Sequence, residues 1–198
     1  MNRIDRKFSE LREQGVPAFI PFFTAGDPDL ETTEKLIISA EEAGADLIEL
    51  GFPYSDPIAD GPTIQASYTR ALDRGQRSEN VLGLVSSLRE HSQIPVVAMI
   101  SYSIVFRMGF ESFVDQSLKA GIDGATVPDL PVEESDDLLA LDVSEHPRIL
   151  PVLREEALDD VREIVGIGAA LLVGGEAGIG GSGEDLRRSA AEIDGAAA

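Results

Sequence analysis

The sequence predicts an α/β fold in which parallel strands alternate with helices around a barrel. Three features of the 198-residue chain support this prediction. Short apolar segments of strand length recur six times, longer amphipathic segments lie between them, and several of the longer segments stop at a glycine. Such alternation is typical of a parallel sheet with right-handed crossovers. The six expected strands lie at residues 18–23, 47–50, 94–100, 124–127, 148–153 and 169–173.

The helices are predicted from apolar residues that repeat every three or four positions. In the first helix Ile4, Phe8 and Leu11 fall on one face, and Gly15 ends the segment; Gly44 ends the second helix in the same way. No short-period repeat and no internal linker divides the chain, so residues 1–198 are expected to form a single domain. The expected helices lie at 3–14, 30–43, 63–74, from Ser78 or Asn80 onward, and at 109–121, 133–141, 158–165 and 184–193.

The composition is that of a soluble globular protein. Hydrophobic residues make up 43% of the chain, cysteine is absent, and no apolar run is long enough to cross a bilayer. The first ten residues mix basic and apolar side chains, and neither an apolar stretch nor a cleavage site follows them. We therefore expect a cytoplasmic protein without disulfides and without a membrane partner.

The chain is strongly acidic. Its formal charge is −20 at pH 7, its only lysines are Lys7, Lys35 and Lys119, and acidic residues are spread over most predicted helices. This charge argues against nucleic acid as a partner, and dispersed acid on a normal apolar fraction indicates a folded, halophile-like surface. The screening length falls from about 30 Å at 0.01 M salt to about 3 Å at 1 M, so folding is expected to depend on salt.

The stretch from Asp46 to Gln65 combines a buried acid with a stiff loop. Glu49 interrupts an apolar strand, where a carboxylate is costly unless it is paired or used. Prolines at positions 53, 57 and 62 stiffen the following loop, which carries Asp56 and Asp60 toward Glu49. Two carboxylates in different surroundings form a natural acid/base pair. Purely structural interpretations of these acids stay open, because a strand-end glutamate often pairs with an arginine or a capped helix, and Asp-Pro and Asp-Gly are ordinary turn sequences.

This stretch closely resembles the signature of the tryptophan synthase alpha subunit family. The shared pattern runs from Glu49-Leu50-Gly51 through Ser55-Asp56-Pro57 and Ala59-Asp60-Gly61-Pro62 to Ile64-Gln65. The resemblance implies a TIM (β/α)8-type barrel and a lyase of tryptophan biosynthesis, a branch of aromatic amino-acid biosynthesis. The implied reaction is the retro-aldol cleavage of indole-3-glycerol phosphate to indole and glyceraldehyde 3-phosphate, without a metal or organic cofactor. The length of the signature argues against a different phosphate-binding barrel enzyme.

The resemblance also assigns roles in the site. It implies that Glu49 is the general acid and that Asp60 takes or stabilises the indole N–H proton. It places Phe22 in the indole pocket. It places Tyr102, as a second substrate-binding residue, in the loop after the third strand, where Ser103 stands in place of the family's asparagine. Asp129 is expected to cap the helix that follows it or to hold its loop.

Two further groups of residues are matched to the family. Gly178 and Gly181 correspond to the glycines of a mobile active-site loop and are expected to bind substrate, with Gly180 in place of the family's threonine. Pro53, Asp56 and Pro57 lie in the region that contacts the beta subunit. The implied partner is therefore a tryptophan synthase beta subunit in an α2β2-type heterotetramer.

The predicted strands number six, whereas the family's barrel has eight. The loops after the seventh and eighth strands commonly supply the phosphate site of such barrels, and the sequence has no counterpart to them. We therefore expect a partial barrel with about six of eight βα units. A second hypothesis stays open: a catalytically impaired partner-binding module that retains the loop facing the beta subunit.

Overall fold

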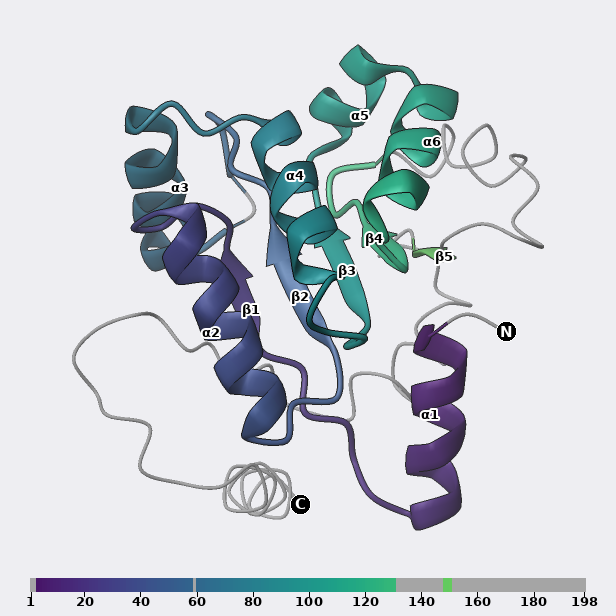
Figure 1. The fold of residues 1–198 in the computed structure, drawn as a ribbon. Helices are drawn as coiled ribbons and strands as arrows, with labels where there is room; N and C mark the ends of the chain where they lie inside the picture. The colour runs from purple at the N-terminus through teal and green to yellow at the C-terminus, as the bar shows by residue number, and fades with distance from the viewer. Residues whose placement is uncertain (1–2, 59, 131–147, 151–198) are drawn as a thin grey trace, which may run out of the picture.

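The computed structural model describes residues 3–58, 60–130 and 148–150, which contain a parallel sheet of five strands. The strands follow one another across the sheet in chain order, and every neighbouring pair is parallel. This order arises when each crossover carries the chain to the next position, as in a barrel. The strands are β1 (Phe22–Thr24), β2 (Ile48–Gly51), β3 (Val96–Met99), β4 (Gly124–Thr126) and β5 (Arg148–Leu150) (Figure 1).

Six helices lie among the described residues, and none of them is long and apolar enough to cross a membrane. Five of them confirm predicted helices. Where the sequence predicts a helix end, the observed end lies within one residue of it. The helices and the strand predicted at 133–141, 158–165, 169–173 and 184–193 lie outside the described residues. The observed helices are α1 (Arg3–Gln14), α2 (Leu30–Glu42), α3 (Pro62–Asp73), α4 (Ser78–Leu88), α5 (Tyr102–Met108) and α6 (Phe110–Ala120).

Two strands are shorter than predicted, because prolines interrupt the ladder. The first begins at Phe22 rather than at residue 18, since Pro17 and Pro21 have no N–H to donate. The Pro21 carbonyl still accepts from the backbone N–H of Glu49 at 3.0 Å, which holds the approach to β1 beside β2. The third strand begins at Val96, after Pro95, and ends at residue 99 rather than 100.

Helix α5 is absent from the sequence-based prediction. It has only seven residues, too few for an apolar repeat to stand out. Side chains at its N-terminus explain why it forms. Ser101 Oγ accepts from the backbone N–H of Ser103 at 3.2 Å, and Asp129 Oδ1 accepts from the backbone N–H of Tyr102 at 2.6 Å. Asp129 therefore caps the helix that precedes it; the helix predicted after it, at 133–141, lies outside the described residues.

One face of the sheet is covered by helices and holds the main core. Figure 1 shows α2, α4 and α6 lying against this face, and they contact one another in that order. Alternate strand residues point into it, among them Ile48, Leu50 and Val96, all fully buried. Phe23 belongs to the same cluster.

The opposite, inner face carries the acid and is covered at one end by α1. The register pairs Phe22 with Glu49 and Glu49 with Val97, and partners in a parallel ladder point to the same side. Val97 and Leu47 form a second, smaller cluster with Ile4 of α1. Figure 1 shows α1 beyond the N-terminal ends of the strands. The C-terminal ends, where barrel enzymes carry their active sites, lie at the other end of this face.

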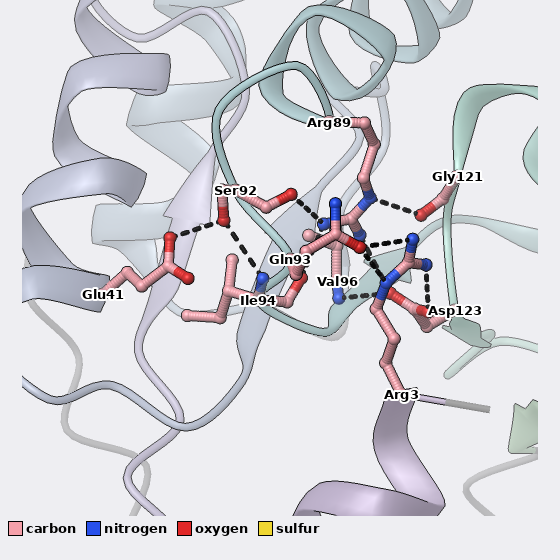
Figure 2. Close-up of polar contacts among 9 residues, drawn as sticks. All are labelled: Arg3, Glu41, Arg89, Ser92, Gln93, Ile94, Val96, Gly121 and Asp123. Atoms are coloured by element: carbon pink, nitrogen blue, oxygen red, sulfur yellow. Dashed lines mark hydrogen bonds and ion pairs between the residues drawn. The ribbon is translucent and has the colours of Figure 1, made fainter. Parts of the chain in front are cut away.

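A buried ion cluster fastens α1 and α4 to the N-terminal ends of the strands (Figure 2). Asp123, which immediately precedes β4, accepts hydrogen bonds from Arg3 Nη1 at 2.9 Å, Arg89 Nη2 at 2.9 Å and Val96 N at 3.0 Å. Only 3% of the Asp123 side chain is exposed. A buried carboxylate is tolerated where its charge is paired and its oxygens are hydrogen-bonded, and Asp123 meets both conditions.

Candidate active site

Glu49 lies on the inner face of the sheet, near the C-terminal end of β2. Its side chain is partly buried and makes no hydrogen bond or ion pair with any other residue in the described ranges. Burial raises the pKa of Glu49, and the nearby Asp60 carboxylate raises that pKa further. A carboxyl group with a raised pKa keeps its proton nearer to neutral pH, so Glu49 is suited to donate one.

The loop after β2 is fixed at both ends. Phe52 and Pro53 are buried, and the backbone N–H of Phe52 donates to the Met99 carbonyl of β3 at 2.8 Å. From α3, Gln65 Nε2 donates to the carbonyl oxygens of Pro57 at 3.2 Å and Asp60 at 2.8 Å. These contacts return the chain toward the strand ends, which places Asp60 within electrostatic reach of Glu49 as predicted.

Asp60 has surroundings different from those of Glu49. Tyr54 Oη donates to Asp60 Oδ2 at 3.4 Å, a long hydrogen bond. Burial raises the pKa of Asp60, the Tyr54 bond lowers it, and the negative charge of Asp129 raises it again. Burial, together with Asp60 and Asp129, raises the pKa of Tyr54 to about 12. Tyr54 therefore stays protonated and acts as a donor at neutral pH.

Phe22 packs against Gly51 on the inner face. A Cβ atom added to Gly51 would lie 2.5 Å from Phe22 Cζ and 2.7 Å from Tyr68 Oη, far inside contact distance. Position 51 therefore admits only glycine unless the Phe22 ring moves. The structure brings Phe22 to the same face as Glu49.

Tyr102, predicted in a loop, is the first residue of α5, and its ring lies near aromatic rings of α5 and α6. The ring centroids of Phe106 and Phe110 are 5.9 and 6.1 Å from that of Tyr102. Ser101 Oγ donates to Asp129 Oδ2 at 2.7 Å, so Asp129 joins the loops that follow β3 and β4. The Asp129 carboxylate thus holds these loops together, and its negative charge also raises the pKa of Asp60.

The remaining predicted site residues divide into two groups. Gly178 and Gly181 lie outside the described residues. In the loop assigned to partner binding, Pro53 is buried and Asp56 is exposed, with Pro57 between these extremes. The neighbouring Ile58 is 91% exposed, an unusual position for a large apolar side chain.

Sequence reasoning missed Tyr68, which is fully buried beside the acids. The pattern that could have identified Tyr68 is the helical spacing of Ser67, Tyr68 and Ala71, which form the buried side of α3. Thr24 and Ser67 share a hydrogen bond at 2.6 Å, which fixes this helix against β1. Thus α3 forms a wall of the site rather than a surface element.

A groove at the opposite end of the strands does not belong to this site. Its volume is about 490 Å³, and it lies between α1 and the segments that precede β2 and β3. Two of its charged residues form an ion pair, Lys7 Nζ and Asp46 Oδ1 at 4.0 Å. Asp46 Oδ2 also accepts from the backbone N–H of Phe19 at 2.8 Å, which indicates a structural role.

Several curated proteins are similar to this chain over most of its length. A tryptophan synthase alpha chain of Caldanaerobacter subterraneus subsp. tengcongensis is 46% identical over 164 residues, covering 83% of this chain and 63% of the relative. One from Rhodopirellula baltica is 52% identical over 141 residues, covering 70% of this chain and 51% of the relative. The chain thus spans less than two thirds of the length of these relatives.

Solved structures agree with the sequence similarity. Tryptophan synthase subunit alpha from Legionella pneumophila str. Paris matches with a TM-score of 0.75 and 33% identity, covering 81% of this chain and 63% of that one. A tryptophan synthase complex from Pyrococcus furiosus matches with a TM-score of 0.66 and 36% identity, covering 74% and 62%. These matches confirm the predicted TIM-barrel type, of which five consecutive strands are described.

The family model for the tryptophan synthase alpha chain matches residues 8–163. That range includes every described element of the site, from Phe22 on β1 to Asp129 after β4. It also covers more than half of the chain. The chain therefore belongs to the tryptophan synthase alpha chain family.

Proposed function

We propose that the protein is a carbon–carbon lyase of tryptophan biosynthesis, which cleaves indole-3-glycerol phosphate to indole and glyceraldehyde 3-phosphate. The observation that carries this proposal is the environment of Glu49. In this member of the family, burial and the neighbouring Asp60 raise the pKa of the Glu49 carboxyl group at the mouth of the barrel.

The retro-aldol step needs a proton at the indole carbon that bears the glycerol chain. Protonated Glu49 delivers it, while Asp60 accepts the indole N–H proton or stabilises the positive charge that develops there. The Glu49 carboxylate then takes the proton of the adjacent chain hydroxyl, and the carbonyl of glyceraldehyde 3-phosphate forms. The electrons of the broken carbon–carbon bond return to the ring, Asp60 returns its proton, and indole is released.

Phe22 supports an aromatic substrate. Its ring is held on the inner face by Gly51, at the ladder position opposite Glu49. A flat indole ring stacked against Phe22 would have one edge toward Glu49, where the reacting carbon must lie.

We further propose a beta-subunit partner, bound through the exposed loop that contains Asp56 and Pro57. Ile58 in that loop is 91% exposed, so a partner bound there would remove its apolar surface from water. The similar Pyrococcus furiosus structure is of a tryptophan synthase complex. By this proposal the protein works in the cytoplasm as the alpha component of an α2β2-type heterotetramer.

The test is release of indole from indole-3-glycerol phosphate, with and without a beta subunit. Glu49→Gln keeps the side-chain shape but cannot deliver a proton, so we expect it to lose about 10²- to 10⁴-fold in rate. Glu90→Gln is the matched control, because Glu90 is exposed after α4, near the other end of the strands. A residual Glu49→Gln rate within a few fold of the parent would show that Glu49 is not the acid. A parent that binds the beta subunit but releases no indole would favour a non-catalytic module.

A further inference from the structure

Tyr68 carries a buried hydroxyl group that the fold does not use. The residue is 0% exposed, and its Oη has no hydrogen-bond partner among the described residues. Buried polar groups are nearly always hydrogen-bonded, so an exception calls for an explanation. A phenylalanine would fill the same space without that cost.

The hydroxyl is directed toward the site. It lies 2.7 Å from the position that a Gly51 Cβ would occupy, and Gly51 follows Glu49 by two residues on the same face of β2. The Tyr68 ring also contacts the ring of Tyr54, with centroids 5.4 Å apart and planes tilted by 52°. The two tyrosines thus reach the same place from different elements, one from α3 and the other from the loop after β2.

Asp60 is a hydrogen-bond acceptor for Tyr54 and lies within electrostatic range of Tyr68. Tyr54 already donates to Asp60 Oδ2, over 3.4 Å. Burial raises the pKa of Tyr68, and the charges of Asp60 and Glu49 are among the groups that raise it further. Both tyrosines are therefore donors at neutral pH.

We propose that Tyr54 and Tyr68 form a pair of donors that holds Asp60 ionised and oriented: Tyr54 binds it in the free protein, and Tyr68 completes the pair when the substrate displaces water. This inference rests on the proposed function, in which Asp60 meets the indole N–H. Tyr68 is a positioning residue in this arrangement, since it acts through Asp60.

The groups around Asp60 determine the expected pH effect. Asp129 after β4 disfavours ionisation of Asp60, as does Glu49 on β2 once it has lost its proton, whereas the hydrogen bond from Tyr54 favours it. By this proposal Tyr68 on α3 is a second donor with the same effect. Removing a donor therefore raises the pKa of Asp60. Since a protonated Asp60 accepts the indole N–H more weakly than the carboxylate does, the loss of indole affinity on acidification should then set in at a higher pH.

The experiment measures indole binding by calorimetry between pH 4 and pH 8, on the full chain and its variants. Tyr68→Phe keeps the ring against Gly51 and removes only the hydroxyl. We expect about tenfold weaker binding at pH 7, a typical effect of losing a hydrogen bond to a charged group. The pH of half-maximal binding should move upward, while the thermal midpoint stays equal to that of the parent or rises.

Ser117→Ala is the matched control. Ser117 Oγ is the other buried side-chain atom without a hydrogen-bond partner among the described residues, and it belongs to α6 on the opposite face of the sheet. It should leave both indole affinity and the pH midpoint unchanged. Tyr54→Phe should shift the midpoint in the same direction as Tyr68→Phe, and it tests the pair independently if Tyr68→Phe folds poorly.

The outcomes separate the two proposals. Normal indole binding in the parent, with the same affinity and pH midpoint in both tyrosine variants, overturns the donor pair and leaves the lyase assignment intact. An equal loss of binding in Ser117→Ala also overturns it, because the effect would then be general. A parent that neither binds indole nor releases it from indole-3-glycerol phosphate overturns the proposed function, and the donor pair with it.

Discussion

Phe22 stands directly opposite Glu49 in the register of β1 and β2. A hydrophobic ring and an ionisable carboxyl group therefore share the inner face at one level of the sheet. This arrangement gives Glu49 an apolar neighbour, which favours its protonated form, and gives an aromatic ligand a surface to lie on. The following predictions test this face and the elements that hold it.

Replacing Glu49 should change how stability depends on pH. The pKa of Glu49 is raised in the folded state, so between its unfolded and folded pKa the native protein binds more protons and parent stability falls as pH rises. Glu49→Gln has no ionisable group at this position, so it does not lose stability in this way as pH rises. Its thermal midpoint should match the parent near pH 4 and exceed it at pH 7. A midpoint difference that is constant with pH would contradict the raised pKa.

Asp60→Asn should impair the reaction less than Glu49→Gln does. The amide can still accept a hydrogen bond from the indole N–H, but it cannot take the proton or hold a negative charge beside it. We expect a loss of about tenfold to a hundredfold in kcat/KM, with ligand binding partly kept. Circular dichroism supplies the control, since a collapsed spectrum would make Asp60 a structural residue.

Gly51→Ala should destabilise the protein through a steric clash. The new methyl group would lie 2.5 Å from Phe22 Cζ, so the ring must move, and we expect a loss of about 1–3 kcal/mol with weaker indole binding. Gly83→Ala is the control. Gly83 is exposed on helix α4 and a Cβ there meets nothing within 4 Å, so alanine should stabilise the protein by about 0.5–1 kcal/mol.

Relief of the clash provides an internal check on that prediction. Phe22→Leu in the Gly51→Ala background should recover part of the lost stability, which a double-mutant cycle from urea unfolding would measure as coupling. Additive effects of the two substitutions would show that Phe22 does not press on position 51.

Asp123→Asn should be among the most destabilising polar substitutions. The side chain would lose its charge while facing two guanidinium groups in a buried place, and breaking such a cluster costs about 3–5 kcal/mol. Arg3→Met should cost about 1 kcal/mol or less, because the Arg3 side chain is 34% exposed and its charge stays partly solvated. Denaturant unfolding of both variants checks this order; equal losses would contradict it.

Salt should stabilise the fold strongly. With a formal charge of −20, repulsion among surface carboxylates opposes compaction, and the screening length falls from about 10 Å at 0.1 M to about 3 Å at 1 M. The thermal midpoint should rise steeply between about 0.1 and 2 M KCl, and NaCl at equal ionic strength should give the same curve. A flat profile would remove the halophile-like interpretation.

The fold was largely predictable because local patterns determine its elements. The spacing of Ile4, Phe8 and Leu11 predicts α1 with its observed bounds, and the apolar run around Glu49 predicts β2. Capping of α5 was not predictable, since it depends on Asp129, which lies 27 residues beyond the helix start and reaches it only in the folded sheet. A seven-residue helix held by a distant side chain leaves no periodic signal.

The site was predictable only where its residues fall within one contiguous motif. Glu49 and Asp60 are eleven positions apart in a distinctive stretch, so their pairing could be inferred. Tyr68 could not, because its importance arises from contact with Gly51 and Tyr54 across two elements. A tyrosine in an amphipathic helix looks like ordinary core packing until the hydroxyl is found without a partner.

The contact between Arg3 and Asp123 also sets an order of assembly. The two residues are 120 positions apart, so during synthesis the first helix leaves the ribosome well before its anchor exists. At about 5–20 residues per second, the delay is on the order of 10 s. Through that interval the apolar stripe of α1 has neither Asp123 nor, for most of the time, Val97 to dock on. Newly made chains therefore expose the apolar side of this N-terminal helix until β3 and Asp123 are in place, and α1 should gain hydrogen-exchange protection only after β3 does.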